Sequence, residues 1–312
     1  MSLKTPVAFM IFNRPDTTAQ VFAAIRQARP PKLLVVADGP RVDRPGEAES
    51  CAAVRAVIDG VDWPCEVLIN FAAENMGCKR RISSGLNWVF SQVEGAIILE
   101  DDCLPHPDFF PFCEKMLERY RDDERIMMIG GTNYLLDCLK IEEGYCFSRY
   151  FAIWGWATWR RAWEKYDLNM EEWPRYKKEG ALKVFYSQRF MQRFVSDMFD
   201  DAQTGRCTTW DVQWFYTCLF NNALSITPRV NLISNVGLVG THTSGDTRNN
   251  SFPVYRLACD GMRHPSMVSP NILYDGEFFT KKLKTGVVGL VRKVYFAAKK
   301  RCLNAVRVYL DI

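Results

Sequence analysis

The sequence contains no long apolar run. Its first apolar stretch, residues 7–12, is closed by Asn13-Arg14-Pro15-Asp16 and is too short for the core of a signal peptide. No later stretch reaches the roughly 20 uncharged apolar residues that a membrane-spanning helix needs. We therefore expect a protein that folds and stays in the cytosol.

Paired cysteines, internal repeats and a strong net charge are also missing. The 11 cysteines include no C-x-x-C pair and have no regular spacing, which favours reduced thiols in the core over a disulfide framework or a zinc site. A net charge of +4 over 312 residues is too small to indicate a nucleic-acid partner. With 48% apolar and 24% charged residues, the chain is typical of a globular protein with one large domain or two modest ones.

The first 130 residues alternate short apolar runs with amphipathic stretches. The expected strands are residues 7–12, 33–37, 66–71, 96–99 and 126–129. The expected helices are residues 16–27, 47–58, 79–92 and 108–121. Strands that are apolar throughout and alternate with helices indicate an α/β fold with a mainly parallel sheet covered on both faces.

Polar residues follow the first four expected strands. They are Asn13-Arg14, Asp38-Gly39, Asn75 and the triplet Glu100-Asp101-Asp102. Binding sites in parallel sheets lie beyond the carboxyl ends of the strands, so we expect these residues to share one site. Asp38-Gly39-Pro40 is also consistent with a simple turn.

The acidic triplet is the strongest chemical signal in the chain. Neighbouring carboxylates repel one another unless a cation or hydrogen-bond donors meet them. Carboxylate oxygens suit Mg²⁺ or Mn²⁺, and such an ion also binds phosphates and neutralises charge on a nucleoside-diphosphate leaving group. A solvated acidic turn is the alternative interpretation.

Several motifs occur in the order typical of one enzyme family. The triplet segment resembles the metal-binding segment of the GT-A glycosyltransferases, closest to the N-acetylglucosaminyltransferase I type and its bacterial relatives. The resemblance covers roughly residues 5–245 and is weaker beyond 165. The motifs are VAFMIFNRPDTTAQVFAAI, VVADGPR, ENMGCKRRISSGLNWVF, IILEDDCLPHPDFFPF and GWATWRRAW.

The resemblance implies a GT-A fold with a helical C-terminal extension, a UDP-sugar donor and a Mn²⁺ or Mg²⁺ ion. It implies that residues 1–130 bind the nucleotide sugar, that residues 131–250 bind the acceptor and complete the catalytic half of the same domain, and that residues 251–312 form the extension. The donated sugar would be N-acetylglucosamine or a hexose.

The resemblance also implies roles for individual acids. Asp102 would be the direct metal ligand, and Asp101 would lie near the ribose. Asp38 would contact the base of the nucleotide. In the resembling enzymes a Trp-Asp pair supplies the catalytic base, which points to Asp211; a helix cap is the alternative role for this residue.

Other residues would surround these acids. Arg14, Asn75 and Lys79 would border the nucleotide, although Lys79 also fits an exposed basic start of a helix. His242 would meet the metal or the diphosphate, as a histidine sometimes does in related transferases. Trp154 and Trp156, in a tryptophan-dense stretch, would form a platform for sugar rings or belong to the core.

The last residues, 281–312, mix basic and apolar side chains. This pattern predicts an amphipathic helix, either lying on the anionic inner face of the cytoplasmic membrane or docked on the domain. Membrane contact would suit a lipid-linked oligosaccharide acceptor; another glycan is the alternative acceptor.

Three other functions remain open at this point. A retaining transferase of the same fold would form the opposite anomer. A sugar nucleotidyltransferase would share the sheet and the metal chemistry, but it usually carries a glycine-rich loop after the first strand, where this chain has Asn13-Arg14-Pro15-Asp16. A glycan-binding protein without activity would need no intact acidic triplet.

Overall fold

A computed structural model describes residues 3–136, 139–237 and 253–280 of the chain. The strands are β1 (Val7–Ile11), β2 (Lys32–Ala37), β3 (Glu66–Phe71), β4 (Gly95–Glu100), β5 (Cys103–Pro105), β6 (Ile126–Gly130), β7 (Tyr145–Ser148), β8 (Trp156–Trp159), β9 (Leu224–Pro228) and β10 (Ile233–Asn235). The helices are α1 (Pro15–Ala28), α2 (Glu47–Ala56), the 3₁₀ helix η1 (Val57–Gly60), α3 (Cys78–Gln92), α4 (Phe109–Arg119), α5 (Arg160–Trp163), α6 (Trp173–Glu179), α7 (Leu182–Phe185), α8 (Arg189–Gln203) and α9 (Asp211–Phe220).

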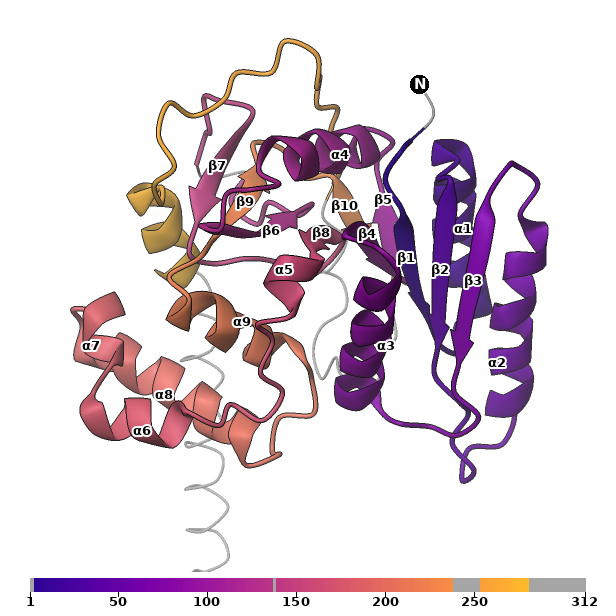
Figure 1. Cartoon of the computed structure of the whole chain (residues 1–312), viewed down its shortest axis with the longest axis horizontal. Helices are drawn as coiled ribbons and strands as arrows, with labels where there is room; N and C mark the ends of the chain where they lie inside the picture. Colours follow the sequence, from indigo (N-terminus) through magenta and orange to yellow (C-terminus); the bar gives the residue numbers. More distant parts are fainter. Residues whose placement is uncertain (1–2, 137–138, 238–252, 281–312) are drawn as a thin grey trace, which may run out of the picture.

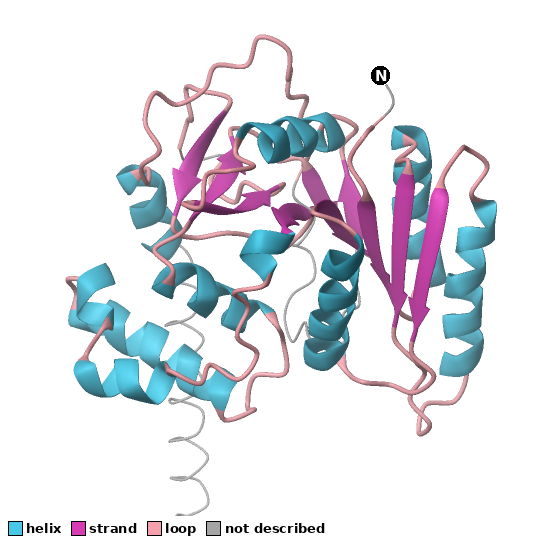
Figure 2. Cartoon of the chain, viewed as in Figure 1, coloured by secondary structure: helices cyan, strands magenta, loops and turns pink. Residues whose placement is uncertain are grey.

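Within the described residues, one eight-stranded sheet runs through the molecule in the order β3-β2-β1-β4-β8-β6-β9-β7. The strands β3, β2, β1 and β4 are parallel to one another, and β6 is parallel to β9. The antiparallel pairs are β4–β8, β6–β8 and β7–β9. The predicted α/β fold with a mainly parallel sheet is therefore confirmed, and Figure 2 shows helices flanking the strands.

Helices cover both faces of the sheet because successive strand residues point to opposite sides. On one face, Val7 and Phe9 of β1 belong to a core shared with α1, α2 and α4. On the other face, Ala8 and Met10 belong to a core shared with α3, α5 and α9. A third core joins α6, α7 and α8 with residues 274–279, and Figure 1 shows these three helices grouped away from β1–β3.

The tryptophan-dense stretch contributes mostly to the core. Trp156 opens β8, is fully buried, and packs against Trp163, Trp210 and Trp214 with ring centroids 5.4 to 6.3 Å apart. A sugar ring cannot stack on an indole that has no exposed face, so the structure contradicts the substrate platform expected at Trp156. The alternative interpretation, a core residue, is the correct one.

Apart from β5, the first 130 residues match the expected elements closely, and the residues after them differ. The expected strands at 66–71 and 126–129 and the helix at 79–92 all lie within a residue of the observed elements. Strands β5, β7 and β8 were not expected. Because β8 inserts between β4 and β6, the sheet is continuous across position 130.

None of the helices in the described ranges has both the length and the apolar character needed to cross a bilayer. Two predictions fall outside those ranges. His242 lies in the gap between residues 237 and 253, and the expected basic helix at 281–312 follows the last described residue.

Candidate active site

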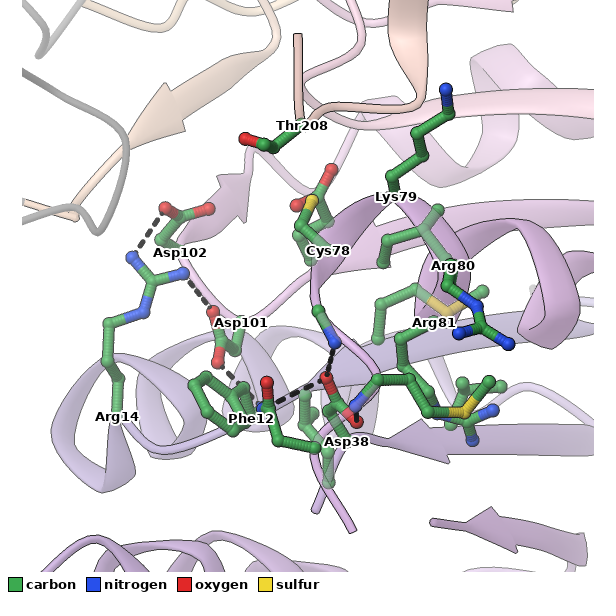
Figure 3. Close-up of a pocket in the computed structure, with 18 of the residues that line it drawn as sticks. Phe12, Arg14, Asp38, Cys78, Lys79, Arg80, Arg81, Asp101, Asp102 and Thr208 are labelled. Carbon is green, nitrogen blue, oxygen red and sulfur yellow. Dashed lines mark hydrogen bonds and ion pairs between the residues drawn. The ribbon is translucent and has the colours of Figure 1, made fainter. Parts of the chain in front are cut away.

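A cavity of about 660 Å³ lies at the carboxyl ends of the parallel strands. It is enclosed on the sheet side by the loops after β1, β2, β3 and β4, and on the other side by the loop before α9 and the chain after β10 (Figure 3). The predicted site residues that line it are Arg14, Asp38, Asn75, Lys79, Asp101, Asp102 and Trp154. Side chains up to 140 positions apart in the sequence thus share one cavity, as expected for strand ends of a parallel sheet.

Arg14 connects the ends of two neighbouring strands. It lies in the loop after β1, and Asp101 and Asp102 directly follow β4, which pairs with β1. Its Nη1 donates to Asp102 Oδ2 at 2.7 Å and its Nη2 donates to Asp101 Oδ1 at 2.5 Å (Figure 3). The second oxygen of Asp101 accepts the backbone N–H of Phe12 at 3.0 Å. Asp101 therefore fastens the loop after β1, and the expected ribose contact would have to compete with these bonds.

The chain after β10 closes over this ion pair. Strand β10 pairs with β5, and the N–H of Val236 donates to the carbonyl of Asp102 at 2.8 Å. A Cβ on Gly237 would lie 2.5 Å from Asp102 Oδ2 and 2.7 Å from Arg14 Nη1. Only glycine fits at this position without moving the pair.

Burial and charge together shift the pKa values of the acidic triplet. Burial, with the charges of Asp102 and Asp101 acting in the same direction, raises the pKa of Glu100 to about 8. Burial also raises the pKa of Asp101 to about 6, because it outweighs the opposing effect of Arg14. Burial alone would lower the pKa of Arg14, but the two carboxylates raise it above its ordinary value. The strand end thus holds more negative charge than one guanidinium balances.

Asp38 has a different environment at the end of β2. Its Oδ1 accepts the N–H groups of Gly39 and Met76 at 2.9 and 2.8 Å, and its Oδ2 accepts Gly77 N–H and Asn75 Nδ2 at 3.0 and 3.1 Å. The side chain is buried, with 7% of its surface exposed. Asp38 and Asn75 therefore hold the loop between β3 and α3 against β2. We expected Asp38 to contact the base of a nucleotide, but both of its carboxylate oxygens already accept hydrogen bonds from the chain itself.

The three basic residues at the start of α3 differ in what their side chains contact. Lys79 Nζ donates to the carbonyl of Ala202 in α8 at 3.2 Å, which ties α3 to the helical layer. Arg81 is buried and donates to Ala37 O and to Asn70. Arg80 is exposed and lines the cavity, and its guanidinium has neither a hydrogen bond nor an ion pair with any described residue.

Asp211 lies beside the cavity at the first residue of α9. Cys207 and Thr208, just before it, line the cavity, whereas Asp211 itself does not. No side chain caps α9, so the helix-cap alternative for Asp211 is not what the structure shows. Its Oδ1 is buried without a hydrogen-bond partner among the described residues, and it is close enough to Glu100 for its charge to raise the pKa of that residue.

The cavity also contains residues to which sequence analysis assigned no individual role. Glu100, Arg80, Thr208 and Gly237 all line it. The position of Glu100 at the end of an apolar strand was a usable signal, as was the basic run that contains Arg80. Nothing in the sequence indicates that Gly237 meets Asp102. Trp154 lines the cavity as expected and packs edge-on against Tyr134, with ring centroids 5.5 Å apart.

The sequence matches no protein-family model and no curated protein. Three solved structures share part of the chain's fold at low similarity. They are a UDP-glucose pyrophosphorylase with UDP-glucose (10% identity, 52% of this chain and 79% of that one, TM-score 0.31), a CMP:2-keto-3-deoxy-manno-octonic acid synthetase with CTP (13%, 58% and 86%, 0.32) and a 4-diphosphocytidyl-2C-methyl-D-erythritol synthase from Anaerococcus prevotii (10%, 52% and 76%, 0.32).

The described residues do not form a ready divalent-metal site. Within the described ranges, no three histidine, cysteine, aspartate or glutamate side chains converge as ligands. Asp102, the expected ligand, has one oxygen on Arg14 and the other 3.4 Å from Cys103 Sγ. Arg14 is hydrogen-bonded to both carboxylates. The Mn²⁺ or Mg²⁺ ion stays a prediction that this arrangement does not fit.

Proposed function

We propose that this chain is a glycosyltransferase of the GT-A kind, which transfers a sugar from a UDP-sugar to a hydroxyl of a glycan or of a lipid-linked oligosaccharide. The observation that carries the proposal is the convergence of Arg14, Asn75, Lys79 and Asp102 on one cavity at the carboxyl ends of parallel strands. Its volume of about 660 Å³ is within the range that small-molecule sites occupy.

Cations and carboxylates share this cavity in a way that suits a diphosphate and a sugar. The guanidinium of Arg80 has no partner among the described residues and projects from the amino-terminal turn of α3, where the helix dipole also favours an anion. Arg14 adds a second cation on the opposite wall, in the loop after β1. The diphosphate would lie between the two, and Trp154 would contact the sugar.

Asp211 is the proposed general base of an inverting transfer. Its carboxylate takes the proton of the acceptor hydroxyl, and the oxygen forms a bond to the anomeric carbon. The bond from that carbon to the phosphate oxygen breaks, and its electron pair leaves with UDP. The products are the glycoside of inverted configuration, UDP and a protonated Asp211, which returns its proton to solvent. The buried, unpartnered Oδ1 of Asp211 supports this role.

A screen of ligands by thermal unfolding tests the function. A ligand that binds only the folded protein raises the melting temperature. We expect UDP and one UDP-sugar to raise the melting temperature. We also expect that UDP-sugar to release UDP when it is incubated with the protein and a suitable acceptor. The anomeric configuration of the product, read by NMR, distinguishes inversion from retention.

Other outcomes of the same screen point to the alternative functions. Pyrophosphate formation from UTP and a sugar 1-phosphate would identify a nucleotidyltransferase. Stabilisation by glycans with no response to any nucleotide sugar would identify a glycan-binding protein. Membrane attachment on the cytoplasmic side through residues 281–312 is part of the proposal; loss of binding to anionic vesicles in a chain truncated after residue 280 would support it.

A further inference from the structure

The two acids after β4 are already paired with a cation that belongs to the chain. Arg14 meets Asp102 and Asp101 with separate nitrogens, 2.7 and 2.5 Å from their oxygens. The carboxylates are largely shielded, with 16% and 4% of their side-chain surfaces exposed. Charged hydrogen bonds that are shielded from water are stronger than exposed ones.

The surroundings hold this pair in place. Asp101 is fixed from behind by the N–H of Phe12, and Asp102 by the pairing of its carbonyl with Val236. Gly237 passes so close to Asp102 and Arg14 that a methyl group there would overlap both. An ion entering between the carboxylates would have to displace Arg14, which would leave a half-buried guanidinium without its partners.

Arg14 also keeps donors for a ligand. A guanidinium carries five N–H groups, and the hydrogen bonds to the two acids use one on each terminal nitrogen. The side chain is 30% exposed and lines the cavity, so its remaining N–H groups are available to a phosphate. Such an arrangement places a fixed positive charge at the position where GT-A enzymes are expected to hold an ion.

We infer that Arg14 is the cation that binds the donor diphosphate, and that donor binding needs no divalent metal. The inference rests on the proposed function, because it assumes a nucleotide-sugar donor. The carboxylates of Asp101 and Asp102 then serve to orient the guanidinium rather than to bind an ion.

Calorimetric titration of the full chain with UDP tests this inference. We expect the same affinity, within about twofold, in excess EDTA and in Mn²⁺. The paramagnetic resonance signal of free Mn²⁺ should stay unchanged when the protein is added without nucleotide. If UDP binds only when Mn²⁺ is present, the inference is overturned while the proposed function stands. If neither UDP nor any nucleotide sugar binds in either condition, the proposed function itself fails.

Substitutions of Arg14 sharpen the result. Arg14→Met keeps the length and removes the charge, so UDP affinity in EDTA should fall about 10- to 100-fold. It also frees two acids, so we expect Mn²⁺ binding to appear and to restore part of the UDP affinity. Arg14→Lys retains a positive charge beside the buried acids, so its UDP affinity in EDTA should lie between that of the unchanged chain and that of Arg14→Met. Arg44→Met, at an exposed arginine outside the cavity, should behave as the unchanged chain. Unaltered UDP affinity in folded Arg14→Lys and Arg14→Met would contradict the inference.

Discussion

Asp38 and Asp102 both follow a buried parallel strand, yet their surroundings differ completely. Asp38 accepts four hydrogen bonds from neutral N–H groups, all within the loops after β2 and β3. Asp102 is paired with Arg14, an arginine 88 positions away, in a cluster that also contains Asp101 and Glu100. The first carboxylate is satisfied by its own loops, and the second belongs to a charged wall of the cavity.

This difference shows that position at a strand end does not decide what a carboxylate does. Neutral backbone donors make Asp38 a fastening point, since a ligand that displaced them would leave buried N–H groups without partners. The two loops also pack closely against each other, which further fixes Asp38 in place. A Cβ on Gly39 would lie only 2.4 Å from the carbonyl carbon of Glu74. At the end of β4 the three acids outnumber the one arginine that pairs with them, so these side chains can still interact with a ligand.

The largest expected effect concerns Asp211, the acid that lies beside the cavity at the start of α9. Asp211→Asn keeps the shape and removes the base, so turnover should fall by about 10²- to 10⁴-fold while UDP affinity changes little. Rapid-quench measurement of UDP release and calorimetry would separate the two quantities. Asp197→Asn, an exposed residue of α8, is the matched control. Normal turnover in Asp211→Asn would remove Asp211 as the base.

The next effect compares the two strand ends directly. Asp38→Ala leaves three backbone N–H groups and the Asn75 amide without their acceptor, so the free energy of unfolding should fall by about 3 kcal/mol. Asp102→Ala should cost about 1 kcal/mol, because Arg14 keeps Asp101. Urea unfolding of both variants gives the comparison, with Asp43→Ala in an exposed loop as control. A larger loss in Asp102→Ala would reverse our assignment of structural and functional acids.

A smaller effect is expected where the chain after β10 covers the ion pair. Gly237→Ala places a methyl group 2.5 Å from Asp102 Oδ2, so these side-chain ends must shift. Overpacking of this kind should lower the free energy of unfolding by about 1 kcal/mol and weaken UDP binding more than it weakens folding. Gly276→Ala, which meets no atom within 4 Å, is the control. Equal UDP affinity in the two variants would show that the pair does not contact the donor.

A last prediction concerns how the end of β4 responds to pH. Because the pKa of Glu100 is raised from 4.5 to about 8, the folded chain holds a proton that the unfolded chain releases. The stability contributed by Glu100 is therefore complete below 4.5 and is lost as pH rises through about 8. Glu100→Gln cannot titrate, so its melting temperature should decline less over this window. Parallel curves for the two proteins would contradict the raised pKa.

Much of the fold was accessible from the sequence because its strands in the first half are mainly apolar. The helix expected at 79–92 and the strand at 66–71 match α3 and β3 almost residue for residue. The short strand β8 was not recognisable, since the tryptophans that open and close it fit a strand, a core or a binding platform equally well. Its burial between β4 and β6 is what assigned Trp156 to the core.

The sequence by itself determined which polar residues stand at strand ends, and therefore which residues gather in one cavity. That follows from local periodicity and from the common direction of parallel strands. Only the tertiary structure decided which of those residues are bonded to each other. The order of the strands places Arg14 beside Asp101 and Asp102, and Gly237 packs against Arg14 and Asp102. Such contacts join segments that are distant in the sequence, so they depend on packing that no local sequence pattern records.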